Sequence, residues 1–150
     1  FRARERIRFV VFNHEIVDVV DFEIEDPEAA SADQAQIRSY VATMEAGGDT
    51  ATFSALEEAY LIATEARAVD PDRFYSVVLL TDGDNNSGIT RTSFERAYRT
   101  LGADDIRTFP ILFGAANEDD MEFVAELTGG RVFHGDSGLT EAFKKIRGYQ

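Results

Sequence analysis

Apolar residues along the chain follow two periodicities, one typical of strands and one typical of helices. Short runs rich in β-branched and aromatic residues predict strands at 7–13, 19–24, 75–80, 106–114 and 131–134. Apolar residues spaced at i, i+3, i+4 and i+7 predict helices at 37–44, 53–68, 94–101, 121–127 and 139–146. The alternation of the two kinds of segment on short loops predicts the α/β class.

The first two predicted strands differ from the others in their connection. Only a few residues around His14 separate them, which is too short for the crossover that parallel strands need. We therefore expect an antiparallel hairpin. From Phe74 onward strands alternate with helices, a pattern typical of parallel βαβ units with helices on both faces. The two patterns together predict a three-layer, Rossmann-like, mostly parallel sheet with one antiparallel edge hairpin.

The charge balance excludes one class of partner. The 150 residues carry 28 acidic and 15 basic side chains, a formal net charge of −13, which repels a phosphate backbone. We therefore expect no nucleic-acid partner. Cysteine is absent, which excludes disulfides, thiolate metal sites and a cysteine nucleophile. No apolar run approaches the ~18 residues of a membrane span, so we also expect no membrane insertion.

Two loops rich in side-chain oxygens adjoin the predicted elements. Residues 82–86, Asp-Gly-Asp-Asn-Asn, leave the strand at 75–80, and residues 47–52, Gly-Gly-Asp-Thr-Ala-Thr, enter a helix. Open α/β sheets bind ligands at the carboxyl ends of their strands. Carboxylate, hydroxyl and amide oxygens suit Mg²⁺, Mn²⁺ or Ca²⁺ better than zinc. The alternative is that these are ordinary turn residues and that Thr50 or Thr52 caps the helix.

The segment GGDTATFSAL, followed by SVVLLTDGDNNSG, resembles the von Willebrand factor type A domain, a family that includes the I domains of integrins. RTFPILFGAANEDDMEFVAELTGGRVFHG resembles the last strands and helices of that family, so the resemblance covers nearly the whole chain from Ile7. It implies that Thr50 and Asp82 are the second-loop and third-loop ligands of a metal ion-dependent adhesion site, which binds Mg²⁺, Mn²⁺ or Ca²⁺ in the complete domain. The residues implied at the rim of this site are Asp49, Thr52, Gly83, Asp84, Asn85 and Asn86.

The chain departs from the family at the first loop of the metal site. The family carries Asp-x-Ser-x-Ser at the end of its first, central strand, but no serine here follows an Asp by two positions. We interpret residues 1–150 as a single domain that is N-terminally incomplete, without that strand and the helix after it. Thr50 and Asp82 are then two ligands of an incomplete shell. We expect divalent-cation binding by this chain alone to be weak or absent.

The central strand of the family would lie between the strands at 7–13 and 75–80. Without it, these two strands either pair directly, or each presents an unpaired edge, or another chain or the rest of the parent protein fills the slot by strand addition. We expect the isolated chain to form a homo-oligomer in which each molecule covers the gap of the other.

The resemblance implies a non-enzymatic domain for protein recognition or adhesion. A partner would complete the metal shell with an acidic side chain. An extracellular or cell-surface location is favoured over a cytoplasmic one.

A Mg²⁺-dependent phosphatase of the haloacid dehalogenase-like type is the alternative function. LLTDGDNN matches a pattern in which Asp82 would be the nucleophile and Asp84 the general acid, with distal carboxylates from residues 118–120. Such a reaction needs a cationic group near the transferred phosphoryl group. The two lysines, Lys144 and Lys145, lie on the last predicted helix instead. The Asp-x-Asp pattern also belongs near the N-terminus of that fold, so we predict that the chain is not an enzyme.

Overall fold

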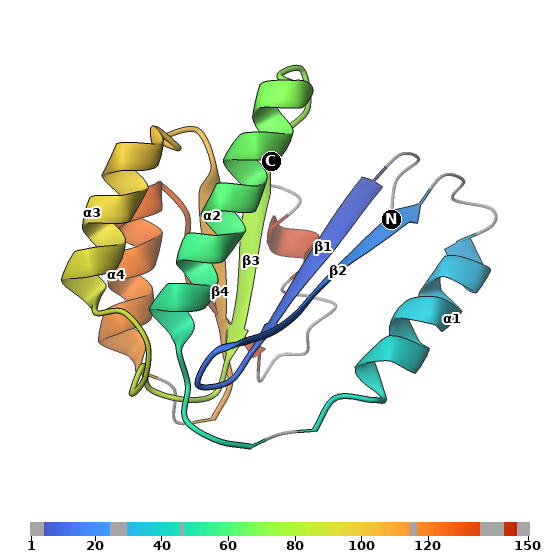
Figure 1. The fold of residues 1–150 in the computed structure, drawn as a ribbon, viewed down its shortest axis with the longest axis horizontal. Coiled ribbons are helices and arrows are strands. Elements are labelled where there is room, and N and C mark those ends of the chain that lie inside the picture. The colour runs from blue at the N-terminus through green and yellow to red at the C-terminus, as the bar shows by residue number, and fades with distance from the viewer. Residues whose placement is uncertain (1–4, 25–29, 46, 115–116, 136–142, 147–150) are drawn as a thin grey trace.

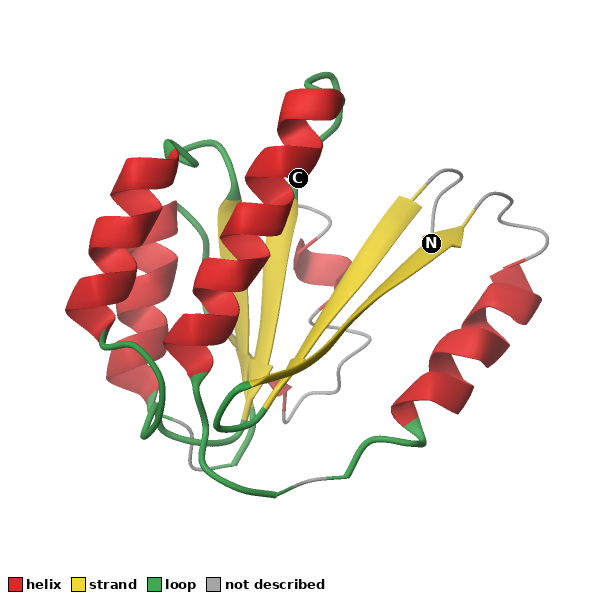
Figure 2. Cartoon of the chain, in the orientation of Figure 1, coloured by secondary structure: helices red, strands yellow, loops and turns green. Residues whose placement is uncertain are grey.

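The computed structural model describes residues 5–24, 30–45, 47–114, 117–135 and 143–146 and confirms the α/β class. The strands and helices follow in the order β1 (Glu5–Phe12), β2 (Ile16–Ile24), α1 (Ala30–Val41), α2 (Thr52–Val69), β3 (Ser76–Thr81), α3 (Arg91–Leu101), β4 (Arg107–Leu112), α4 (Glu118–Thr128) and β5 (Phe133–His134) (Figure 1). Figure 2 shows the same chain coloured by type of element. None of the described helices is both long and apolar enough to cross a membrane.

Strands β1 and β2 form the predicted antiparallel hairpin. Phe9 pairs with Val20, and the register shifts only beside the turn. Helix α1 covers one face, because Phe9, Phe22 and Tyr40 form a cluster of rings with centroids 5.4 to 6.4 Å apart. Phe12, three positions after Phe9, points to the other face and packs against the main core. The hairpin therefore packs against α1 on one face and against α2 and the main core on the other.

The remaining strands form the predicted parallel sheet, in the order β3-β4-β5. On one face, α2, α3 and α4 contribute to a core that includes Phe53 and Phe94. On the other face, side chains of β4 and β5 pack against Ile146 of the helical segment 143–146. Both faces of the parallel sheet are therefore covered, as its buried strands require. Leu139, which was expected on the same closing helix, lies outside the described residues.

Direct pairing of β1 with β3, one of the three arrangements considered above, is wrong. The strands belong to two separate sheets, since β1 is bonded to β2 and β3 to β4. Figure 1 shows both strands running toward the same end of the molecule, where they lie closest together, and diverging toward the other end. Helix α2 packs against both strands. Packing against the same helix therefore connects the two sheets along their length, where they share no ladder.

Helix α1 ends earlier than the apolar pattern predicts. The pattern extends through Met44 to the glycines at 47–48, whereas the helix ends at Val41. The carbonyl of Tyr40 accepts hydrogen bonds from the N–H and the hydroxyl of Thr43, at 3.0 and 2.7 Å. These bonds tighten the chain into a turn and leave Met44 exposed.

Candidate functional site

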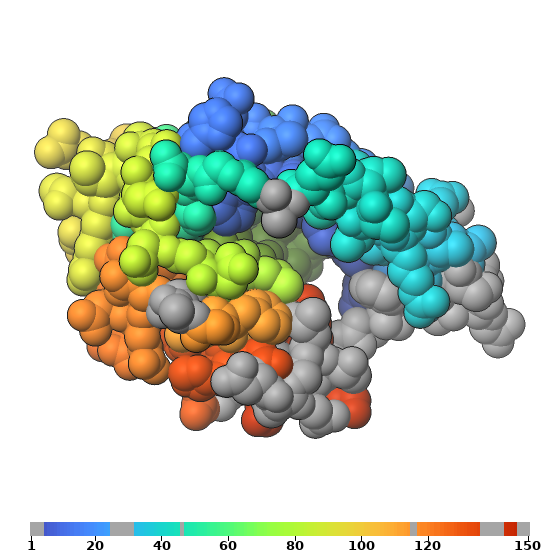
Figure 3. Space-filling view, turned by 90° about the horizontal axis from the view of Figure 1, so that it is seen from below, coloured from blue at the N-terminus to red at the C-terminus, as the bar shows by residue number. Residues whose placement is uncertain are grey.

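Three segments meet at the end of the molecule where β1 and β3 converge. They are the hairpin turn 13–15, the segment 47–51 before α2 and the segment 82–90 after β3, and together we name them the loop cluster. Figure 3, which views the molecule from below, shows the surfaces of these segments next to one another. The cluster lies at the carboxyl ends of the strands, where ligands of open α/β sheets bind.

Hydrogen bonds join the hairpin turn to both other segments. The N–H of Ala51 donates to the carbonyl of Asn13 at 2.6 Å. The hydroxyl of Ser87 donates to the carbonyl of His14 at 3.1 Å. Main-chain carbonyls of the turn are the acceptors in both bonds, so the connection does not depend on the side chains of the turn.

The two residues predicted to bind a metal, Thr50 and Asp82, lie in adjacent segments of the loop cluster. A Cβ atom placed on Gly83 would lie 3.1 Å from the Oγ1 atom of Thr50. Thr50 is half-buried and Asp82 is exposed. Neither the Thr50 hydroxyl nor the Asp82 carboxylate makes a hydrogen bond or ion pair with any residue that the structure describes. Both oxygen groups are therefore available to a ligand.

Two asparagines after β3 hold Thr50 and the start of α2 in place. The N–H of Thr50 donates to Oδ1 of Asn86 at 2.6 Å, and the N–H of Asn86 donates to the carbonyl of Thr50 at 3.0 Å. Oδ1 of Asn85 accepts from the N–H of Phe53, in the first turn of α2, at 3.0 Å. Helix N-termini need such acceptors, and the N-cap residue, Ala51, supplies none from its side chain. The alternative in which a threonine of this segment caps α2 is therefore wrong.

The other residues predicted at the rim differ in exposure. Asp49 and Asp84 are exposed, whereas Gly83 and Asn85 are half-buried. Thr52 is fully buried, and its Oγ1 atom has no hydrogen-bond partner among the described residues. It lies beneath the surface rather than on the rim, because it belongs to the first turn of α2, several of whose side chains are buried.

The available oxygens fit part of the coordination shell of a hard divalent cation. Hydroxyl and carboxylate oxygens are ligands that Mg²⁺ and Ca²⁺ prefer. Within the described ranges, no group of three or more His, Cys, Asp or Glu side chains lies close enough together to hold a metal ion. One threonine and one aspartate leave most positions of such a shell to water and to a partner.

The sequence indicates only that His14 lies in a turn, and the structure adds its place beside the site. A Cβ atom on Gly48 would lie 3.3 Å from Nδ1 of His14. The sequence did carry one signal for this location: the turn follows the carboxyl end of β1, and ligands of open α/β sheets bind at such ends. The hairpin turn is the part of the loop cluster that sequence reasoning missed.

The acidic residues 118–120 lie at the start of a helix, and two of them lie near basic side chains. They form the first turn of α4, where negative charge complements the helix dipole. A carboxylate oxygen of Asp120 lies 3.5 Å from the guanidinium of Arg91, and one of Glu118 lies 3.7 Å from Nε2 of His134. This arrangement gives no support to a phosphatase site.

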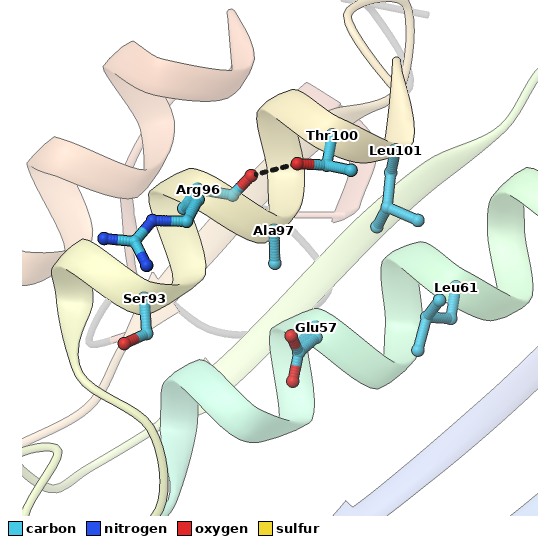
Figure 4. Close-up of a pocket in the computed structure, with 7 residues that line it drawn as sticks. All are labelled: Glu57, Leu61, Ser93, Arg96, Ala97, Thr100 and Leu101. Carbon is cyan, nitrogen blue, oxygen red and sulfur yellow. Dashed lines mark hydrogen bonds between the residues drawn. The ribbon is translucent and has the colours of Figure 1, made fainter.

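A second concave feature lies between α2 and α3. It is an open groove of about 360 Å³. Figure 4 shows Leu61 from α2 opposite Ala97 and Leu101 from α3, and the hydroxyl of Thr100 donating to the carbonyl of Arg96 at 2.8 Å. The groove is lined mainly by apolar surface and shares no residue with the loop cluster, so we assign no chemistry to it.

The covered parallel sheet and the polar loops at its carboxyl edge define a Rossmann-like α/β domain. The sequence-family model of the von Willebrand factor type A domain matches residues 2–145, and the chain therefore belongs to this family. Members are protein-interaction and adhesion domains that are generally not enzymes. Nothing in this membership supports the phosphatase alternative.

Solved structures agree with this fold. A von Willebrand factor type A protein from Catenulispora acidiphila matches with a TM-score of 0.68 and 18% sequence identity, over 99% of this chain and 33% of that one. The chain thus spans about a third of the length of that protein. An uncharacterized membrane spanning protein from Vibrio fischeri gives a TM-score of 0.45 and 16% identity, over 97% of this chain and 76% of that one, which is too low to support an argument. Proteins with curated descriptions give no match.

Proposed function

We propose that the chain is a non-enzymatic recognition domain of the adhesion type, in which Thr50 and Asp82 form part of a metal ion-dependent adhesion site. One observation carries this proposal. The Thr50 hydroxyl approaches the backbone at Gly83, next to Asp82, and neither oxygen group has a partner within the described part of the chain. Mg²⁺, Mn²⁺ or Ca²⁺ is the expected cation because both ligands are hard oxygens.

The partner is expected to contribute an acidic side chain. A cation would supply positive charge between Asp82 and that carboxylate. The charge matters because the chain carries −13 overall and because Asp49 and Asp84 are exposed near the two ligands. An acidic partner approaching without a cation would be repelled. The hydrogen bonds that the two asparagine side chains accept fix the Thr50 segment in advance, so less conformational freedom is lost on binding.

Paramagnetic broadening of amide NMR signals by Mn²⁺ tests the site even when binding is weak. We expect Mn²⁺ to broaden the signals of the loop cluster first. Asp82→Asn is expected to remove this selectivity, and Thr50→Ala to reduce it. Asp72→Asn is the matched control, because Asp72 is also exposed but lies between α2 and β3, at the other end of the strand. Broadening spread evenly over the acidic surface and unchanged by Asp82→Asn would contradict the proposal.

Among the strands that the structure describes, β1 pairs only with β2 and β3 only with β4, which supports the proposal that two copies of the chain associate by strand addition at the remaining edges. The N–H of Phe113 donates to the carbonyl of Thr81 at 3.1 Å, so the peptide groups of Thr81 face β4. Successive residues of a strand alternate, so those of Val78 and Leu80 face the open edge. Unpaired edges of this kind favour association. Size-exclusion chromatography with light scattering is expected to show dimers, and a monomer at every concentration would refute this proposal.

A further inference from the structure

The hairpin turn 13–15 belongs to the loop cluster, but the proposed function gives it no role. Ser87 places it close to the proposed ligands. The hydroxyl of Ser87 donates to the carbonyl of His14 at 3.1 Å, while its N–H donates to the carbonyl of Thr50 at 3.2 Å. One residue therefore bonds to the turn and to a proposed ligand. The turn is a third wall of the same site.

The turn is internally ordered. The N–H of Asn13 donates to the carbonyl of Glu15 at 3.0 Å, and the N–H of Glu15 donates to Oδ1 of Asn13 at 3.1 Å. Together with the bond from Ala51 to the carbonyl of Asn13, these contacts fix the backbone that carries His14. The position of the imidazole is thus set by a held main chain.

The imidazole of His14 lies against a glycine and opens to solvent. Gly48 has a φ of +86°, and a Cβ there would lie 3.3 Å from Nδ1 of His14. Any side chain at position 48 would therefore press on the ring. The His14 side chain is 54% exposed, and its Nε2 atom lies 3.6 Å from Oε1 of Glu15, beyond hydrogen-bond distance. An N–H of the ring can therefore reach a bound partner.

Charge makes His14 distinct within the loop cluster. The ionisable side chains of the three segments are His14, Glu15, Asp49, Asp82 and Asp84, so the histidine is the one that can donate a hydrogen bond at neutral pH. The side-chain amide of Asn85 is already used, since it donates to the carbonyl of Ile89 at 3.3 Å. A carboxylate arriving at this rim meets four like charges and one imidazole.

We propose that His14 determines specificity by donating a hydrogen bond from its imidazole to the carboxylate of an acidic partner. The inference rests on the proposed function, because the same carboxylate would complete the cation shell at Thr50 and Asp82. The second contact distinguishes a carboxylate from other oxygen ligands. The imidazole of His14 carries at least one N–H in either protonation state, so the hydrogen bond requires no change of pH.

The probe is the acetylated and amidated tripeptide Gly-Asp-Gly, titrated into the chain with Mg²⁺ in excess and followed by amide NMR. We expect His14→Ala to weaken binding about fivefold, the factor that one ordinary hydrogen bond provides. His14→Gln keeps a donor and is expected to retain most of the affinity. His134→Ala is the matched control, because this exposed histidine lies outside the loop cluster. The tripeptide Gly-Asn-Gly is expected not to bind.

The outcomes separate this inference from the function on which it rests. The main-chain carbonyl of His14 is unchanged in the variants, so the amide spectrum of each should remain that of the wild type outside the turn. If Mg²⁺ and the peptide shift the Thr50 and Gly83 signals but His14→Ala binds as well as His134→Ala, the role of His14 is overturned and the proposed site stands. If neither Mg²⁺ nor the peptide shifts the Thr50 and Gly83 signals of the wild type, both proposals fail.

Discussion

The parallel sheet and the hairpin lie side by side but are stabilised in different ways. In β4, five of six residues are buried, and helical segments cover both faces of that sheet. In β2, Ile24 is the one buried residue, and Val17 is 57% exposed. Ion pairs at exposed positions, such as Arg8 with Asp21, link the two strands of the hairpin.

This difference shows where the free energy of unfolding is concentrated. Burial of apolar surface contributes roughly 25 cal/mol per Å². Exposed ion pairs contribute about 0–1 kcal/mol each. The parallel half should therefore dominate stability. The hairpin depends on α1, on α2 and on the loop cluster for its position, because no ladder joins it to β3.

A matched pair of aromatic deletions gives the largest expected contrast between the two regions. Phe94 is fully buried, and its ring centroid lies 5.7 Å from that of Phe53. Phe94→Ala is expected to lower the free energy of unfolding by about 3–5 kcal/mol. Phe22, on the hairpin, is only half-buried, and Phe22→Ala is expected to cost about 1–2 kcal/mol. Urea unfolding followed by circular dichroism measures both, and equal losses would break the comparison.

An intermediate loss of stability is expected when the buried hydroxyl of Tyr60 is removed. It donates to the carbonyl of Ile106 at 2.9 Å and lies 2.6 Å from Oγ1 of Thr108. Tyr60→Phe is expected to lower the free energy of unfolding by about 1–2 kcal/mol, because a buried carbonyl loses its donor. The same urea experiment measures this loss.

The pH dependence of that variant sharpens the test. Burial raises the pKa of Tyr60, so the folded state holds this proton more tightly than the unfolded chain. The resulting stability is present below the ordinary tyrosine pKa of about 10 and is lost as pH rises above it. Wild type should therefore lose more stability than Tyr60→Phe between neutral pH and about pH 11. A parallel decline of the two proteins would argue against a protonated, buried hydroxyl.

The smallest effect is expected from the ion pair between Arg8 and Asp21. Their side chains are 41% and 64% exposed, so Arg8→Met should cost no more than about 0.5 kcal/mol. A hydrogen bond from Arg8 lowers the pKa of Asp21, so this contribution is present above the ordinary Asp pKa and is lost as pH falls through the lowered value. Melting temperatures of both proteins should converge as salt is added. A loss as large as that of Phe22→Ala would mean that charge holds the hairpin.

Most of the fold could be predicted from the sequence because its signals lie within single elements. Period-2 and period-3.6 patterns locate the strands and helices, and the short connection at His14 identifies the hairpin. The end of α1 could not be predicted, because the Thr43 hydroxyl competes for a helical carbonyl where the apolar pattern continues. The separation of the two sheets could not be predicted either, because it depends on contacts between elements that are distant in the sequence.

The candidate site could be predicted only in part. Its proposed ligands, Thr50 and Asp82, follow from a family resemblance, but the bonds that position them do not. The bonds that Asn85 and Asn86 accept from Phe53 and Thr50 join residues 32 and 36 positions apart. The bond that Ser87 donates to the hairpin turn spans 73 positions. Periodicity carries no information about such distant pairs, and asparagine and serine are ordinary turn residues.

The bonds from Ala51 and Ser87 attach the hairpin at the loop end, while its length beside β3 has no ladder. Any tilting of the hairpin against the parallel half therefore has its pivot at those bonds. Displacement grows with distance from a pivot, so the far ends of β1 and β2 would swing while Thr50 and Asp82 hardly move. A ligand bound to the loop cluster would keep its coordination geometry through such a motion.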